Sequence, residues 1–230
     1  MLDSNRLSVQ FVRLPQGLGT RDLRESFHWL SQDELASYQR FRNDRRKVEY
    51  LVGRVLAKSM LEEITGVRVR GVALANGAYG KPFLPGYERQ LDFSISHTTG
   101  LVVCAVAARK QVGVDVENTE RDCFEVMQYA FTEAETQWVL AHLESGDKRR
   151  EFNSIWTRKE ASLKASGRGM AASPASCPVP LSPGVVQDAR FCYWTFAPVT
   201  GYLVSVCTSR DEGAAPRLAL TQSNLRELLR

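Results

Sequence analysis

Two acidic side chains separated by one residue stand in the segment 112–117, which reads VGVDVE. The alternating valines predict a strand, on which side chains two positions apart share a face. Asp115 and Glu117 would then lie together, and their like charges repel unless a cation is present. Carboxylate oxygens suit Mg²⁺ or Mn²⁺, and Mg²⁺ commonly takes substrate phosphates as further ligands. A strand end that reaches solvent would carry the same acids, so this pattern alone leaves both interpretations open.

A second candidate pair lies in residues 151–166, where apolar residues recur at helical spacing. Glu160 follows Trp156 by four residues and Lys164 follows Glu160 by four, so the three side chains share one helix face. Glu160 and Lys164 are either an ordinary surface pair or a metal ligand beside an ammonium that binds phosphate. Trp156 is expected in the core.

Three further residues could together bind a phosphate group. Lys81 lies in a Gly-Lys-Pro loop, and Ser96 and His97 end the predicted strand FSISH at 93–97. A positive charge, a hydroxyl and an imidazole are all suitable phosphate partners. A structural histidine and a solvated lysine are the alternatives. The first long helix carries a basic surface, of which most side chains are expected to be solvated and one or two to reach an anionic ligand. Its arginines are Arg40, Arg42, Arg45, Arg46 and Arg54.

The periodicity predicts strands joined by two long helical regions. One helical region runs from about residue 31 to residue 64, with a break near residues 43–44 and Gly66 at its end. The closing residues 224–230 form a further candidate helix. Strands are predicted over 5–13, 67–74, 91–96, 100–108, 111–117, 189–195, 202–208 and 218–220.

A pair of similar helix starts indicates an internal duplication. Ser31 and Glu34 form a capping-box pattern, and Thr132 and Glu135 repeat it 101 residues later. Further on, the basic residues of the two helices align at an offset of 104 residues, which implies a small insertion. Two offsets this close predict a duplicated α+β unit with a boundary near residues 109–110.

Composition excludes several classes of protein. The 230 residues are 43% hydrophobic and 24% charged, which is typical of a globular protein and rules out disorder. A net charge of +4 fits an anionic small ligand or an acidic partner protein and is only weak evidence for nucleic-acid binding, which is not expected. The five cysteines form no CxxC pair and are expected to be reduced thiols.

No signal peptide or membrane-spanning segment is predicted. The longest apolar run, Leu101 to Ala108, is far shorter than the ~20 residues that a transmembrane helix needs. A cytoplasmic location without membrane contact is therefore expected. Walker A, Rossmann, GxSxG, CxxC zinc and HExxH patterns do not occur, which removes the common nucleotide hydrolases, dinucleotide enzymes, α/β-hydrolases and zinc hydrolases.

Taken in order, four motifs resemble the 4′-phosphopantetheinyl transferases of the Sfp type. The motifs are GKP at 80–82, FSISH at 93–97, GVDVE at 113–117 and WTRKEASLK at 156–164. The resemblance implies an α+β pseudo-dimer of two similar halves, each a small antiparallel sheet packed with a long helix. The halves would be residues 1–109 and 110–230, with the active site between them.

The resemblance also implies a reaction. The 4′-phosphopantetheine arm of coenzyme A would move to a serine of an apo carrier protein, with release of 3′,5′-ADP. Asp115, Glu117 and Glu160 would hold Mg²⁺, with Mn²⁺ a possible substitute. Glu160 would accept the proton of the serine, and Lys164 would neutralise the pyrophosphate.

Other roles follow from the same resemblance. His97 would bind the 3′-phosphate of coenzyme A, and the full expected set of coenzyme A contacts is Lys81, Ser96, His97, Lys159, Lys164, Arg46 and Arg54. Phe124, Met127 and Tyr129 would contact the carrier. The partner would be an acyl carrier protein or a peptidyl or polyketide carrier domain, and a monomer is expected because one chain already holds both halves.

Two other hypotheses compete with the transferase. A Mg²⁺-dependent pyrophosphohydrolase would use water in place of serine, with coenzyme A or a nucleotide as substrate. A non-catalytic protein that binds coenzyme A or a carrier would have kept only the fold.

Overall fold

The computed structural model describes residues 5–120, 124–142, 144–169, 173–210 and 215–230. The chain divides into two compact units. The first unit comprises Met1–Asn76, Pro82–Arg109 and Pro216–Arg230, and the second comprises Gly77–Lys81 and Lys110–Ala215. Within the described residues, no helix combines the length and apolar character that crossing a membrane would need.

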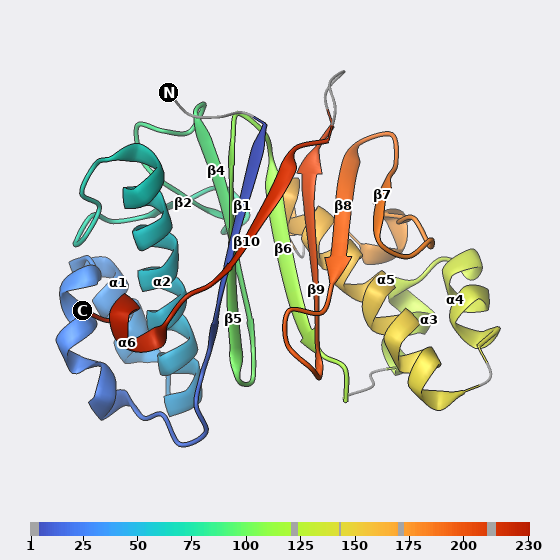
Figure 1. Cartoon of the computed structure of the whole chain (residues 1–230), viewed down its shortest axis with the longest axis horizontal. Helices are drawn as coiled ribbons and strands as arrows, with labels where there is room; N and C mark the ends of the chain where they lie inside the picture. Colours follow the sequence, from blue (N-terminus) through green and yellow to red (C-terminus); the bar gives the residue numbers. More distant parts are fainter. Residues whose placement is uncertain (1–4, 121–123, 143, 170–172, 211–214) are drawn as a thin grey trace. The chain divides into compact units, whose positions relative to one another are not determined.

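The first unit is built on a four-stranded sheet with the order β10-β1-β5-β4. Its strands are β1 (Arg6–Arg13), β4 (Leu91–Thr98), β5 (Leu101–Ala108) and β10 (Arg217–Gln222). The β1–β5 and β5–β4 pairs are antiparallel. In contrast, β10 runs parallel to β1, and Figure 1 shows it in red beside the blue β1.

This pairing corrects the predicted division of the chain. We expected residues 110–230 to form the second half, but β10 hydrogen-bonds to the edge of β1 and belongs to the first unit. The first sheet is therefore mixed and not purely antiparallel. The mixed α+β class itself is confirmed, since each unit combines a four-stranded sheet with a long helix.

The predicted long helix with a break is two helices. They are α1 (Gln32–Arg40) and α2 (Asp44–Thr65), and the side chain of Asn43 caps α2 by accepting a hydrogen bond from the backbone of Arg46. Gly66 ends α2 in the left-handed conformation, at φ 69°, where a residue without a Cβ is favoured. The other short elements are η1 (Thr20–Trp29), β2 (Ala75–Asn76), β3 (Pro82–Phe83) and α6 (Leu225–Leu228).

The strand predicted over 67–74 is wrong. The backbone there is bound by side chains of α2 in place of a neighbouring strand. The carboxylate of Glu62 accepts hydrogen bonds from the N–H groups of Val69 (2.8 Å) and Arg70 (3.1 Å). The ammonium of Lys58 donates to the carbonyl of Val72 at 2.7 Å. Residues 67–74 therefore form a loop, and their alternating apolar side chains reflect packing against the end of α2 and not strand pairing.

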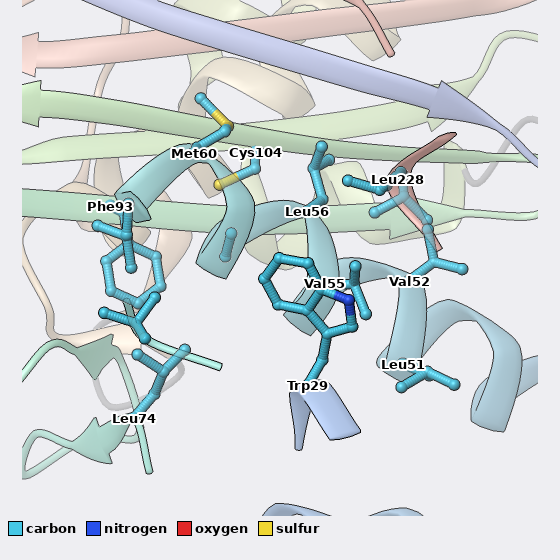
Figure 2. Close-up of a cluster of buried hydrophobic side chains, with 14 of the residues drawn as sticks. Trp29, Leu51, Val52, Val55, Leu56, Met60, Leu74, Phe93, Cys104 and Leu228 are labelled. Atoms are coloured by element: carbon cyan, nitrogen blue, oxygen red, sulfur yellow. The ribbon is translucent and has the colours of Figure 1, made fainter. Parts of the chain in front are cut away.

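The core of the first unit lies between α2 and its sheet. Figure 2 shows Val55, Leu56 and Met60 of α2 in a cluster with the indole of Trp29 and with residues of β4 and β5. Leu228 of α6 joins the same cluster, which fixes the C-terminal segment to this unit. Burial of this apolar stripe holds α2 against the sheet.

The second unit has a four-stranded antiparallel sheet with the order β6-β9-β8-β7. Its strands are β6 (Val112–Asn118), β7 (Val185–Gln187), β8 (Phe191–Phe196) and β9 (Tyr202–Ser209). Its helices are η2 (Phe124–Val126), α3 (Met127–Ala130), α4 (Glu133–Leu140), α5 (Ser145–Ala165) and η4 (Pro174–Ser176). The long helix α5 packs on β6 and β9.

The same buried ion pair occurs in both units. In the first, the capping-box residue Glu34 binds the ammonium of the fully buried Lys58. In the second, Glu135 lies 2.8 Å from the ammonium of the fully buried Lys159. Each lysine follows its glutamate by 24 residues, and the two pairs are 101 residues apart. The offset of 101 therefore runs through both helices, and the second predicted offset of 104 is wrong.

One glycine sets how closely β6 approaches α5. A Cβ atom at Gly113 would overlap the carbonyl oxygen of Ala161 and would lie 2.6 Å from the amide nitrogen of Ala165. Both atoms belong to the backbone of α5, so no side-chain rotation could relieve the overlap. Strand β6 therefore lies directly against the helix backbone at this point.

We predict that Gly113→Ala destabilises the protein by about 3 kcal/mol or more, because overpacking against a backbone forces the strand and helix apart. Gly146→Ala is the matched control, since Gly146 is in α5 and a Cβ there meets nothing within 4 Å. We expect that control to be neutral or to stabilise by up to ~1 kcal/mol. Urea denaturation of both variants measures the difference. Equal stabilities would contradict the close approach.

Candidate active site

The acidic face of β6 is covered by α5. Asp115 is only 5% exposed, and its Oδ1 accepts a hydrogen bond from Nζ of Lys164 at 2.6 Å. The three valines of β6 are also buried, on the opposite face. We expected the acids to lie opposite the valines, and they do. The alternative of a strand end that reaches solvent is wrong for Asp115, because its carboxylate is buried and is paired with Lys164, as a buried charge requires.

Lys164 crosses from α5 to β6. Its side chain remains partly exposed while its ammonium holds Asp115. The interaction therefore joins the two site elements, which an ordinary surface pair along one helix would not do. A 2.6 Å contact between oppositely charged groups is a strong, charge-assisted hydrogen bond.

Glu117 is the second carboxylate on this face. The indole N–H of Trp156 donates to its Oε1 at 3.2 Å. Burial, together with the negative charges of Asp115 and Glu160, raises the pKa of Glu117 from 4.5 to about 7, against the opposing effects of Trp156 and Lys164. Trp156, expected in the core, is partly exposed and binds a site residue.

Glu160 supplies the third carboxylate, from α5. Burial raises its pKa, the charge of Asp115 raises it further, and the ammonium of Lys164 opposes both. The pKa values of Glu117 and Glu160 therefore both respond to Asp115 and Lys164. These four residues form one electrostatically coupled group, which we call the acidic cluster.

The acidic cluster fits a divalent cation that takes few protein ligands. Three carboxylates against one ammonium leave an excess of negative charge, and partial burial makes that excess costly. Within the described ranges, no three acidic, histidine or cysteine groups already form a metal cage. Mg²⁺ does not need one, since it usually binds one or two carboxylates, waters and substrate phosphates.

The ammonium of Lys81 binds backbone carbonyl groups of β6 and α5, the two elements that carry the acidic cluster. Its ammonium donates to the carbonyl of Val112, at the start of β6, at 2.9 Å. It also lies 3.3 Å from the carbonyl oxygen of Ala165, at the end of α5. Lys81, which we predicted to contact a phosphate group, thus also joins β6 to α5.

The structure separates Lys159 from the acidic cluster. Its side chain is fully buried, and its ammonium binds Glu135 and the carbonyl oxygens of Pro174 and Cys177, both at 2.9 Å. These partners satisfy all three N–H donors of a lysine. We expected a coenzyme A contact, but this arrangement is structural. The sequence signal for this arrangement was the repeated capping box, because its glutamate, Glu135, is the residue that pairs with Lys159.

In the first unit, His97 lies beside two basic residues of α2. Its Nδ1 is 3.1 Å from Oε2 of the buried Glu49. Arg46 lies 3.6 Å from the same carboxylate, as does Arg45, which also donates to Oγ1 of Thr99 at 3.1 Å. The structure thus brings the predicted residues Arg46 and His97 together.

The remaining candidates of the first unit lie apart from this group. Ser96 precedes His97 on β4, so it points to the opposite face of the sheet, where it is buried. Arg54 lies 3.8 Å from Glu34 and stacks on the ring of Tyr50 at 5.2 Å. Arg54 is thereby tied to the buried Glu34 pair of this unit.

Two of the three expected carrier contacts are accessible. Tyr129 is 60% exposed, and Phe124 is 37% exposed while its ring packs edge-on against Phe152. Met127 is buried in the core cluster of the second unit. A surface of the predicted kind would therefore consist of Tyr129 and Phe124.

Two residues that matter for these arrangements were missed. Glu49 escaped notice although it follows Arg45 by four residues and Arg46 by three, the spacings at which helical side chains meet. Gly113 was the other. Its position between two valines, where a strand disfavours glycine, was the available signal of a close backbone approach.

Comparisons with known proteins agree with this arrangement. The family model described as "4′-phosphopantetheinyl transferase superfamily" matches residues 111–207, which hold all four residues of the acidic cluster. The model described as "4′-phosphopantetheinyl transferase, N-terminal" matches residues 19–109. Together these segments cover most of both units.

Curated relatives carry the same name. The chain is 32% identical over 167 residues to the 4′-phosphopantetheinyl transferase HetI of Nostoc sp., covering 71% of this chain and 70% of that protein. It is 26% identical over 168 residues to the transferase gsp of Aneurinibacillus migulanus, covering 71% and 67%. It is 23% identical over 217 residues to Sfp of Bacillus subtilis, covering 90% and 94%.

These matches define a class of transferase enzymes. The chain belongs to the 4′-phosphopantetheinyl transferase family. The resemblance found in the four sequence motifs is thereby confirmed. The comparisons give no support to the pyrophosphohydrolase alternative.

The raised pKa of Glu117 predicts a pH-dependent stability in metal-free protein. Between pH 4.5 and about 7, folded Glu117 keeps a proton that the unfolded chain releases, so stability falls as the pH rises through this window. Glu117→Gln removes this loss. Urea denaturation in EDTA should therefore show that the free energy of unfolding of Glu117→Gln rises relative to that of wild type as the pH increases to about 7. Above that pH the difference should stay constant.

The control is Glu63→Gln, which changes a glutamate of α2 outside the acidic cluster. Its stability should follow the wild-type pH profile. Parallel profiles for wild type and Glu117→Gln would contradict the electrostatic coupling of the acidic cluster.

Proposed function

We propose that this protein transfers the 4′-phosphopantetheine group of coenzyme A to a serine hydroxyl of an apo acyl or peptidyl carrier protein, with release of 3′,5′-ADP. Membership of the family supports the reaction type. The observation that carries the proposal is the acidic cluster, in which Lys164 of α5 binds Asp115 beside two further carboxylates. A non-catalytic binding protein would not need this combination.

The bond changes in this reaction are few. The serine oxygen forms a bond to the β-phosphorus of the pyrophosphate, and the bond from that phosphorus to the bridging oxygen breaks. The leaving group is 3′,5′-ADP, and the serine proton passes to a base. Such a transfer depends on positioning and on neutralising charge more than on covalent catalysis.

The residues of the acidic cluster divide these tasks. Asp115, Glu117 and Glu160 would hold Mg²⁺, or Mn²⁺ in its place, which would neutralise pyrophosphate charge when bound. Glu160 would accept the serine proton. Lys164 would supply an ammonium to the pyrophosphate, since its side chain reaches from the buried Asp115 to the surface.

Coenzyme A offers further anionic groups. We propose that His97 binds the 3′-phosphate and that Arg46, with more than half of its side chain exposed, adds positive charge there. Lys81 lies on the backbone of β6 and α5 and would contact the phosphates at the nucleotide end. That one active site lies between the halves stays a prediction, as do a direct contact by Ser96 or Arg54, a monomeric state and a cytoplasmic location.

The carrier would bind at the exposed aromatic residues of the second unit. Tyr129 and Phe124 offer apolar surface within the matched segment 111–207, and an amphipathic helix is the kind of element that such a surface accepts. The chain's net charge of +4 also suits a carrier that is acidic around its serine.

The reaction predicts a defined change of mass. Incubation of an apo carrier with this protein, coenzyme A and Mg²⁺ should add the mass of one phosphopantetheine group to the carrier, as read by intact-protein mass spectrometry. EDTA should abolish the gain, because the acidic cluster would lose its cation. Several carriers of the fatty-acid, polyketide and peptide-synthetase types should be tested in parallel.

Free phosphopantetheine formed without any carrier would instead identify a hydrolase. Binding of coenzyme A without modification of any carrier would identify a binding protein. Either result overturns the proposed function.

Replacement of the base gives a second prediction. Glu160→Gln should lower kcat about 10²–10⁴-fold, because the amide cannot accept the serine proton. Glu151→Gln is the matched control, since Glu151 lies on the same helix and binds the indole of Trp138. Steady-state assays with urea denaturation of both variants separate catalysis from folding. A fully active Glu160→Gln protein would refute the assigned role.

A further inference from the structure

One buried carboxylate lies under the positive surface of the first unit. Glu49 is 2% exposed, yet three cationic or titratable groups surround it. Nδ1 of His97 is 3.1 Å from its Oε2, Nη1 of Arg46 is 3.6 Å from the same oxygen, and Nε of Arg45 is 3.6 Å from its Oε1. We call these four residues the basic cluster.

The electrostatics of the basic cluster keep Glu49 ionised. Burial by itself would raise the pKa of Glu49, but His97, Arg46 and Arg45 outweigh burial and the pKa lies below its usual value. Glu49 therefore supplies a fixed negative charge. Against it stand two permanent guanidinium charges and a histidine ring, so a net positive charge remains for a ligand.

The exposed part of the basic cluster is cationic. The side chains of Arg45 and Arg46 are 51% and 55% exposed, whereas that of Glu49 is 3% exposed. A ligand that approaches from solvent therefore meets the two arginines and the ring of His97, which is also partly exposed. A phosphate monoester, which carries close to two negative charges, matches this surface.

The position of Glu49 also determines what the imidazole of His97 can do. A carboxylate 3.1 Å from Nδ1 fixes the orientation of the ring, and a ring that carries protons on both nitrogens donates to Glu49 from Nδ1. Nε2, on the other side of the ring, is then the N–H group that is left to donate to an anion. A neutral ring that donates from Nδ1 would offer Nε2 only as an acceptor.

We propose that Glu49 is a positioning residue for recognition of the terminal 3′-phosphate of the nucleotide substrate, acting through His97. The inference rests on the proposed function, because it assumes that coenzyme A is the ligand. Glu49 itself would not touch the phosphate. It would orient the ring of His97 so that Nε2 faces the phosphate, while Arg45 and Arg46 add charge.

The test compares two ligands that differ only in the 3′-phosphate. Binding of 3′,5′-ADP and of 5′-AMP is measured by calorimetry for wild type, Glu49→Gln, His97→Gln and the double variant. Wild type should prefer 3′,5′-ADP. Glu49→Gln should reduce this preference about tenfold, the value of one charge-assisted hydrogen bond.

The double variant tests whether Glu49 acts through His97. If it does, Glu49→Gln should change the preference less than about twofold when His97 is already replaced. Glu63→Gln, on the same helix, is the matched control and should retain the wild-type preference. If Glu49→Gln does not fold, Glu49→Asp retains the charge but withdraws it by one methylene, and its preference should lie between those of wild type and His97→Gln.

Two results would overturn the inference. One is an equal loss of affinity for both ligands in Glu49→Gln, which is what a merely structural residue would give. The other is additive losses in the double variant. A wild type without preference for 3′,5′-ADP would also reject the inference, while carrier modification read by mass spectrometry would leave the proposed function standing. A wild type that prefers 3′,5′-ADP but modifies no carrier would instead refute the proposed function and leave the role of Glu49 in phosphate recognition standing.

Discussion

The contact of Gly113 with the backbone of α5 is the constraint on which the acidic cluster depends. Asp115 follows Gly113 by two residues and therefore lies on the same face of β6, directed toward the helix. Lys164 immediately precedes Ala165, the residue whose amide nitrogen approaches Gly113. The same close approach thus aligns the strand carboxylates with the helix side chains Glu160 and Lys164. A larger residue at position 113 would push β6 away from α5. It would thereby separate the strand members of the acidic cluster from its helix members.

A second constraint holds the long helices in place. In each unit, one glutamate both completes a capping box at the start of a short helix and binds a fully buried lysine of the long helix. Removal of either partner would leave a buried charge uncompensated, which is among the costliest single changes in a protein. The register of α5 against the start of α4 is therefore fixed at Lys159, one residue before Glu160. A structural pair and a site carboxylate are adjacent in sequence but point to different neighbours.

The sequence predicted the elements better than their partners. Local signals sufficed where the cause is local: the capping boxes at Ser31 and Thr132, the left-handed Gly66 and the alternating strands around Asp115 all appear as expected. Errors arose where a distant group decides the outcome. Residues 67–74 have strand-like alternation, but their backbone is bound by Glu62 and Lys58. The parallel pairing of β10 with β1 likewise joins segments about 200 residues apart, which no local pattern encodes.

The two charged clusters follow the same electrostatic principle with opposite signs. The acidic cluster has three carboxylates and one ammonium, Lys164, bound to its most buried acid. The basic cluster has two guanidinium groups, an imidazole and one carboxylate, Glu49, which is the most buried of its four members. In each, the single opposite charge lowers the repulsion enough for the fold to tolerate the cluster, yet it leaves an excess that a ligand can neutralise. Because that excess is negative in one cluster and positive in the other, the first suits a cation and the second a phosphate. The two charges that complete these clusters, Lys164 and Glu49, thus differ in function: Lys164 reaches the surface and can contact substrate, whereas Glu49 stays buried and acts only through its neighbours.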